Sequence, residues 1–155
     1  MLYIAYGSNM SKEQMAYRCP NSKVVCNGEL HGFILVFNVH ADIIKTNNEE
    51  DVVPVVAWNI ADEDWQMLDM YEGYPSYYVK EIVNVVLEDG KKEEAIVYVM
   101  ADNRKGICPP ASGYFNCIFK GYMDNGINTD YLFDALDYSY NNETEYNKYK
   151  MKGLI

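Results

Sequence analysis

The feature that most constrains the fold is a pair of long β-strand patterns separated by a short turn. Residues 78–87 and 93–101 are rich in β-branched and aromatic side chains, and the sequence EDGKKE joins them. An Asp-Gly pair between two such segments is typical of a β-hairpin. The chain must therefore hold an antiparallel sheet, because a short turn can join only antiparallel strands.

Other parts of the chain also show strand and helix patterns. Strands are predicted at residues 2–6, 23–30, 31–38 and 52–60, and the stretch 41–51 is predicted to be a loop. Pro54 indicates an edge or a bulge in its strand, because proline has no N–H to donate to a neighbouring strand. Helices are predicted at residues 11–18, 61–74, 112–124 and 129–138, and a loop at 102–110.

Several helix ends carry recognisable signals. Ser11, with Gln14 three residues later, forms a capping box. Acidic residues crowd the first turn of the helix at 61–74, as the helix dipole favours, and Gly73 is a typical stop. Ser112 is the predicted N-cap of the third helix.

Strands mixed with few helices, together with one long hairpin, are typical of an α+β fold rather than of alternating βαβ units. Six or so strands in 155 residues can close into a small mixed β-barrel with flanking helices. The length predicts a single domain over residues 1–155. The polar, tyrosine-rich tail from about residue 139 is predicted to be at most partly ordered.

Charge and composition exclude several classes of function. A net charge of −10 argues against partners such as nucleic acid or anionic membranes, which attract basic surfaces. The sequence contains neither a membrane-spanning apolar run nor a signal peptide, so a cytoplasmic location is expected. The four cysteines lack CxxC spacing and the chain has only two histidines, so we expect free thiols and no metal site.

The first strand runs into a turn of three small residues, Gly7, Ser8 and Asn9, just before a helix begins. Backbone N–H groups at such a point lack helical partners and can converge on an anion or an oxyanion. Glycine allows a close approach, and the other two residues add side-chain donors. An ordinary connection between a strand and a helix is the alternative interpretation of this turn.

Glu72 is the candidate for acid/base chemistry. It lies in the last turn of the helix at 61–74, where a negative charge is unfavourable, among apolar and tyrosine side chains. Burial there would raise its pKa toward the operating pH, where a carboxyl is most effective as a proton acceptor and donor. The alternative is a solvated glutamate at a helix end. Asp69, three residues earlier, is expected to be an acid on the helix surface, and the alternative is a residue that supports Glu72 from behind.

The chain resembles the γ-glutamylcyclotransferase-like (AIG2-like) family. The likeness rests on YIAYGSNMSKEQM, on LDMYEGYPSYYVKE about sixty residues later, and on PPASGYFNCIFKGYMDNGI, and it covers residues 2 to about 127. YGSN at the end of the first strand and LDxxEG followed by a tyrosine are its most specific motifs.

The resemblance implies a fold, a reaction and a set of site residues. The fold is the γ-glutamylcyclotransferase-like barrel. The reaction cyclises the γ-glutamyl group of a small-molecule substrate to 5-oxoproline and releases the free amine, with no cofactor. Glu72 is then the catalytic general acid/base. The implied substrate-binding residues are Tyr6, Gly7, Ser8, Asn9, Tyr78 and Tyr114.

Three functions therefore stay open from the sequence. The first is cyclisation of a γ-glutamyl amino acid, and the second is the same reaction on a γ-glutamyl amine, such as an isopeptide or a protected metabolite. The third is a non-catalytic member of the fold that binds a small ligand. The motif YGSN differs from the YGSL form of the glutathione-degrading branch, which this sequence resembles less.

Overall fold

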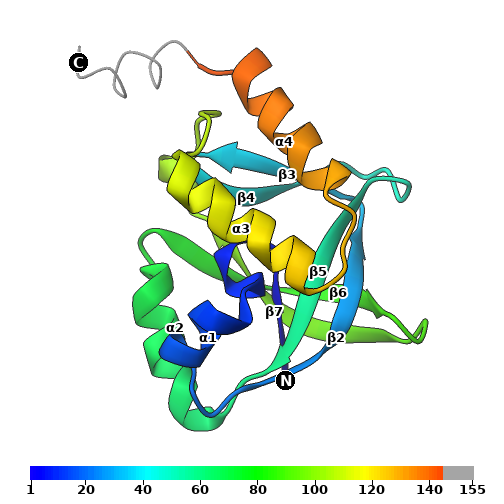
Figure 1. Cartoon of the computed structure of the whole chain (residues 1–155), viewed down its shortest axis with the longest axis vertical. Helices are drawn as coiled ribbons and strands as arrows, with labels where there is room; N and C mark the ends of the chain where they lie inside the picture. The colour runs from blue at the N-terminus through cyan, green and yellow to red at the C-terminus, as the bar shows by residue number, and fades with distance from the viewer. Residues whose placement is uncertain (145–155) are drawn as a thin grey trace.

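The computed structural model describes residues 1–144, and its centre is a closed β-barrel (Figure 1). The strand order in the barrel is β1-β5-β2-β6-β7. β1 closes it by pairing parallel to β7 and antiparallel to β5, whereas the other pairs are antiparallel. The barrel strands are β1 (Leu2–Ala5), β2 (Lys23–His31), β5 (Val52–Asn59), β6 (Tyr78–Leu87) and β7 (Lys92–Met100). The predicted α+β fold with a small mixed barrel is confirmed, and so is the β6–β7 hairpin.

Pro54 lies where its missing N–H does least harm to the sheet. It pairs with Glu29 of β2, while β1 pairs only with residues 56–59 of β5. On the β1 side, therefore, Pro54 has no paired strand. The strand is internal to the barrel as a whole, but it is an edge at this residue, which agrees with the prediction.

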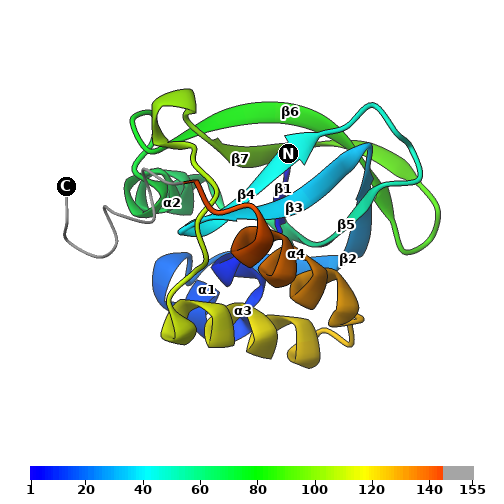
Figure 2. The same cartoon turned by 90° about the horizontal axis from the view of Figure 1, so that it is seen from above.

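A separate two-stranded sheet lies beside the barrel and corrects one prediction. It consists of β3 (Phe33–Asn38) and β4 (His40–Lys45), so the expected loop at 41–51 begins with a strand. An acidic residue in a polar stretch is expected in an exposed loop, and this expectation hides the strand. Asp42 is in fact fully buried beside Ala41 and Ile43. Figure 2 shows α4 packed over this sheet.

The helices form near the predicted positions. They are α1 (Lys12–Arg18), α2 (Trp65–Glu72), α3 (Ser112–Asp124) and α4 (Asp130–Asn141), with a 3-10 turn, η2 (Asp62–Asp64), before α2. The Oγ of Ser11 accepts the N–H of Gln14 at 3.3 Å, which confirms the first cap. Gly73 ends α2 in the left-handed region at φ 64°, as predicted.

Two helix ends differ from the prediction. Ser112 is the first residue of α3 rather than its cap; Ala111 holds the cap position and supplies no side-chain bond. α4 continues to Asn141, so the stretch from 139 begins as helix. Residues 145–155 of the predicted partly ordered tail lie outside the described residues.

The helices α1 and α3 enclose the segment that follows β1. This segment contains the 3-10 turn η1 (Ser8–Met10), and α3 packs closely against it. A Cβ on Gly121 of α3 would lie only 3.0 Å from the Cβ of Met10 and 3.2 Å from the backbone nitrogen of Ser11. A glycine is therefore needed for this contact, which fixes the turn between the barrel and the helices.

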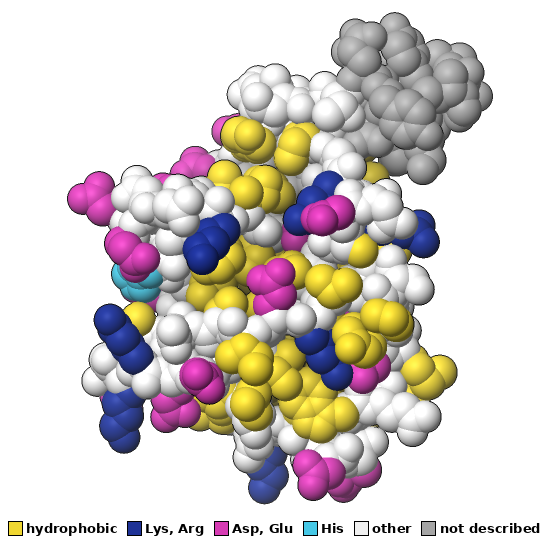
Figure 3. Space-filling model, turned by 180° about the vertical axis from the view of Figure 1, so that it is seen from behind, with side chains coloured by type: hydrophobic (Ala, Val, Ile, Leu, Met, Phe, Trp, Pro, Cys, Tyr) yellow, Lys and Arg dark blue, Asp and Glu magenta, His cyan; other side chains and the backbone are white. Residues whose placement is uncertain are grey.

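The surface mixes charges of both signs with exposed hydrophobic groups. Figure 3 shows this for the face opposite that of Figure 1. Within residues 1–144, no helix is both long enough and apolar enough to cross a membrane.

Candidate active site

One cavity at the end of β1 contains every residue that the sequence predicted for the site. Tyr3, Ala41 and Tyr98 complete its lining, and the sequence reasoning did not predict them as site residues. The lining consists of Tyr3, Tyr6, Gly7, Ser8, Asn9, Ala41, Glu72, Tyr78, Tyr98 and Tyr114. The structure thus brings together groups from β1, η1, β4, α2, β6, β7 and α3.

The turn after β1 is the tight 3-10 turn η1. It is closed by two hydrogen bonds, from Met10 N–H to the carbonyl of Gly7 at 3.0 Å and from Ser11 N–H to that of Ser8 at 3.2 Å. The amides of Ser8 and Asn9 come before these donors and take no part in closing the turn. A Cβ on Gly7 would lie 3.3 Å from the Cβ of Ala41, so glycine allows β4 to approach here.

Asn9 joins this turn to the end of α2. Its Nδ2 donates to Oε1 of Glu72 at 2.8 Å and to the hydroxyl oxygen of Tyr3 at 2.9 Å. One amide group therefore places the Glu72 carboxyl against the strand from which the turn emerges.

Arg18, at the end of α1, determines how Asn9 is oriented. Its Nη1 donates to Oδ1 of Asn9 and, at 3.1 Å, to Oγ of Ser8. The guanidinium also lies 3.4 Å from the ring centroid of Tyr71. Because a guanidinium can only donate, the amide oxygen of Asn9 must face it, and the NH₂ group must face Glu72.

The environment of Glu72 changes its acidity. Burial is the largest effect, and together with the charge of Asp69 it raises the pKa of Glu72 to about 7. The positive charge of Arg18 and the hydrogen bond from Asn9 oppose this rise by favouring the carboxylate. The carboxyl can therefore both accept and donate a proton near neutral pH.

The missed strand β4 positions two of the predicted tyrosines. The hydroxyl of Tyr78 donates to the carbonyl of Ala41 at 2.7 Å, and the N–H of Ala41 donates to the hydroxyl oxygen of Tyr114 at 2.9 Å. Tyr6 is held in a similar way, since its hydroxyl donates to the carbonyl of Tyr98 at 2.6 Å. Burial raises the pKa of Tyr6, Tyr78 and Tyr114, so their hydroxyls stay protonated.

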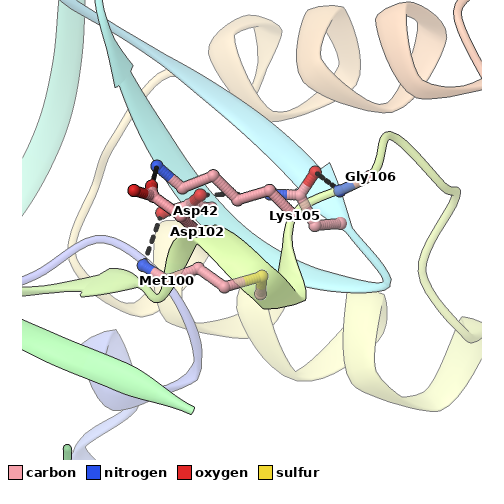
Figure 4. Close-up of polar contacts among 6 residues, drawn as sticks. Asp42, Met100, Asp102, Lys105 and Gly106 are labelled. Carbon is pink, nitrogen blue, oxygen red and sulfur yellow. Dashed lines mark hydrogen bonds and ion pairs between the residues drawn. The ribbon is translucent and has the colours of Figure 1, made fainter. Parts of the chain in front are cut away.

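Asp42, the residue after Ala41, anchors this part of β4 to the end of β7. Its Oδ1 accepts the N–H of Met100 at 2.9 Å, and its Oδ2 accepts the Nδ2 of Asn38 at 3.0 Å. Figure 4 shows the carboxyl of Asp42 at this junction, with Lys105 and Asp102 beside it. This buried carboxyl therefore supports the backbone that holds the two tyrosines.

Asp69 is not the free surface acid that the sequence suggested. It is half-buried and forms an ion pair with Lys80, whose Nζ lies 2.7 Å from its Oδ1. The hydroxyl of Tyr98 donates to the same oxygen. Asp69 thus ties α2 to the hairpin β6–β7.

Two further predictions concern the cysteines and metal binding. All four cysteines are free, as predicted. Among residues 1–144, no group of three or more His, Cys, Asp or Glu side chains is arranged to hold a metal ion.

Comparison with known proteins shows the family of this chain. A family model described as "Gamma-glutamyl cyclotransferase, AIG2-like" matches residues 3–116. The chain belongs to this family. The γ-glutamylcyclotransferase of Homo sapiens is 30% identical over 141 residues, which covers 84% of this chain and 74% of the human one. The protein of the same name in Mus musculus is 29% identical over the same length and coverage.

A solved structure supports the family and the fold together. The structure of a γ-glutamyl cyclotransferase superposes with a TM-score of 0.74 and is 27% identical in sequence. The match covers 87% of this chain and 85% of the other. The family resemblance and the barrel architecture predicted from the sequence are both confirmed.

The role of Asp42 predicts a loss of stability in Asp42→Asn. The new NH₂ group would face the NH₂ of Asn38, whose own oxygen already accepts the N–H of Gly106 at 3.2 Å. We expect the free energy of unfolding, measured in urea, to fall by about 1–3 kcal/mol.

The control is Asp102→Asn, the same chemical change at a side chain that is 99% exposed. We expect it to alter the free energy of unfolding by less than about 0.5 kcal/mol. Equal stability of the two variants would show that the Asp42 carboxyl does not anchor β4.

Proposed function

We propose that the protein cyclises the γ-glutamyl group of a small γ-glutamyl amino acid or amine to 5-oxoproline and releases the free amine. The observation that carries this proposal is a carboxyl with a pKa of about 7, that of Glu72, in a cavity lined by the residues of the turn and by five tyrosines. Membership of the γ-glutamylcyclotransferase family supports the same reaction.

The substrate carries its own nucleophile. Its α-nitrogen can reach the γ-carbonyl carbon to close a five-membered ring, so the cavity needs only to hold the chain folded for an intramolecular attack. The new bond joins the α-nitrogen to the γ-carbon, and the bond from that carbon to the leaving nitrogen breaks. The α-ammonium loses two protons in this process, and the departing amine gains two.

Glu72 is the proposed carrier of these protons. As a carboxylate it accepts one from the α-ammonium, which frees the nitrogen to attack, and as an acid it delivers the proton to the leaving nitrogen. It then repeats the cycle for the second proton. A pKa near neutrality suits both steps, because neither form of the carboxyl is strongly favoured over the other.

The turn and the tyrosines are proposed to bind the substrate. The amides of Ser8 and Asn9 donate to an anionic oxygen, either the α-carboxylate or the oxyanion that develops on the γ-carbonyl. Within residues 1–144, the hydroxyl of Tyr114 accepts a hydrogen bond but is not seen to donate one, so its proton can go to the substrate. The hydroxyls of Tyr6 and Tyr78 donate to backbone carbonyls, so these two side chains form part of the cavity wall.

A non-catalytic binding role explains less of the structure. A binding protein has no need for a carboxyl that titrates near pH 7, nor for the Arg18–Asn9 arrangement that directs an amide at it. The two functions differ in whether the Glu72 carboxyl is required for turnover.

Replacement of Glu72 by glutamine tests the proposal. Glutamine can still accept the bond from Asn9 but cannot carry a proton, so release of 5-oxoproline should fall by about 10²- to 10⁴-fold in kcat/KM. The assay uses purified protein with a panel of γ-glutamyl amino acids and amines. Glu63→Gln, the same change at an exposed site in η2, should leave the rate unchanged. Equal release by the wild type and Glu72→Gln would overturn the role of Glu72.

The pH dependence of the reaction should report the pKa of Glu72. Activity requires the carboxylate form, so kcat/KM should decline as the pH falls through about 7. Arg18→Gln removes a positive charge that favours the carboxylate, so the pKa of Glu72 should rise. The decline of kcat/KM on the acidic side of the pH profile (the acidic limb) should then move to higher pH.

Arg18→Lys is the matched variant for this measurement. It keeps the positive charge, so its acidic limb should lie closer to that of the wild type than the limb of Arg18→Gln does. A limb that stays in place or moves to lower pH in Arg18→Gln would contradict the electrostatic role given to Arg18.

A further inference from the structure

The cavity described above adjoins a second hollow of about 330 Å³, which we call the outer hollow. The two share Ser8, Glu72, Tyr78 and Tyr114, which therefore form the passage between them. If Glu72 carries protons between the two nitrogens of the substrate, the bond that breaks lies in this passage. The γ-glutamyl part then occupies the inner cavity, and the leaving group extends into the outer hollow.

The walls that belong to the outer hollow alone are His40, Tyr71, Gly73 and Tyr77. The ring of His40 is arranged edge to face with two tyrosines of the hollow: its centroid lies 5.7 Å from that of Tyr77 and 4.9 Å from that of Tyr114. Nδ1 of His40 is also 2.7 Å from the hydroxyl oxygen of Tyr77. The hollow is thus a small box with aromatic walls, and Tyr71 is the wall exposed to solvent.

The position of Tyr77 is set by the end of α2. A Cβ on Gly73 would lie 2.9 Å from the Cβ of Tyr77, and Tyr77 N–H donates to the carbonyl of Gly73 at 2.8 Å. Gly73, which ends α2 directly after Glu72, therefore also positions Tyr77 in the wall of the hollow. The acid/base group and this wall are placed by the same turn.

The hollow offers aromatic surface rather than charge. Among the described residues that line it, none is a lysine or an arginine, and burial lowers the pKa of His40, so that ring is neutral at pH 7. The nearby guanidiniums lie over the tyrosine rings, that of Arg18 at 3.4 Å from the Tyr71 centroid and that of Arg104 at 5.1 Å from the Tyr77 centroid. Glu72, at the passage, is the acidic group of the lining.

We propose that this outer hollow is the leaving-group subsite and that it selects leaving groups bearing an aromatic ring, for which it supplies edge and face contacts from His40, Tyr71 and Tyr77. The inference rests on the proposed cyclotransferase function and specifies its substrate class. A leaving group with a small side chain would leave the box unfilled, and the aliphatic chain of lysine has no ring to contact its aromatic walls.

The experiment compares 5-oxoproline release from γ-glutamyl-phenylalanine, γ-glutamyl-alanine and γ-glutamyl-ε-lysine. We expect kcat/KM for the phenylalanine compound to exceed that for the other two by on the order of tenfold or more. Tyr77→Ala should bring the ratio of phenylalanine to alanine rates toward one. Tyr77→Phe retains the ring and should retain most of the ratio. Tyr138→Ala, at an exposed tyrosine of α4, should leave the ratio unchanged.

The outcomes separate the inference from the function on which it rests. Release from all three compounds at similar kcat/KM, or a preference for alanine or lysine, would overturn the aromatic subsite and leave the cyclotransferase function standing. Release from none of them by folded wild-type protein would count against the proposed function, and the subsite would fall with it. The ratio in the wild type decides the matter even if Tyr77→Ala fails to fold.

Discussion

The hydrogen bond from Asn9 to Glu72 is the contact on which the rest of the site depends. It connects the turn after β1 with the end of α2, two segments that are 63 residues apart in the sequence. Its direction is set from outside the cavity by Arg18, which occupies the amide oxygen of Asn9. Burial alone would favour a neutral Glu72, whereas Asn9 and Arg18 favour the charged form, and the balance leaves a carboxyl that titrates near neutral pH.

The barrel supplies the rigid frame for this contact. β1 is held between β5 and β7, so the turn that follows it emerges at a fixed point. The two-stranded sheet adds the opposite wall, because Ala41 bonds both Tyr78 and Tyr114. The site is therefore built where the barrel, the small sheet and the helices meet.

Local signals explain which parts of the molecule the sequence could predict. The turn at Gly7–Asn9, the stop at Gly73 and the hairpin are each encoded by a few adjacent residues, and all three occur in the structure. β4 was missed because Asp42 looks like a loop residue, although its carboxyl is buried against backbone of β7. The parts played by Arg18, Ala41 and Tyr98 depend on contacts between distant segments, and no local pattern marks such contacts.

The ionisation of Glu72 can be measured without substrate. Proteins labelled with ¹³C at glutamate carboxyls, wild type and Glu72→Gln, would be titrated by NMR, and the resonance absent from the variant belongs to Glu72. We expect a midpoint near pH 7 for that resonance. A midpoint near 4.5, the ordinary value for glutamate, would mean that the carboxyl is solvated and would contradict a buried acid/base group at this position.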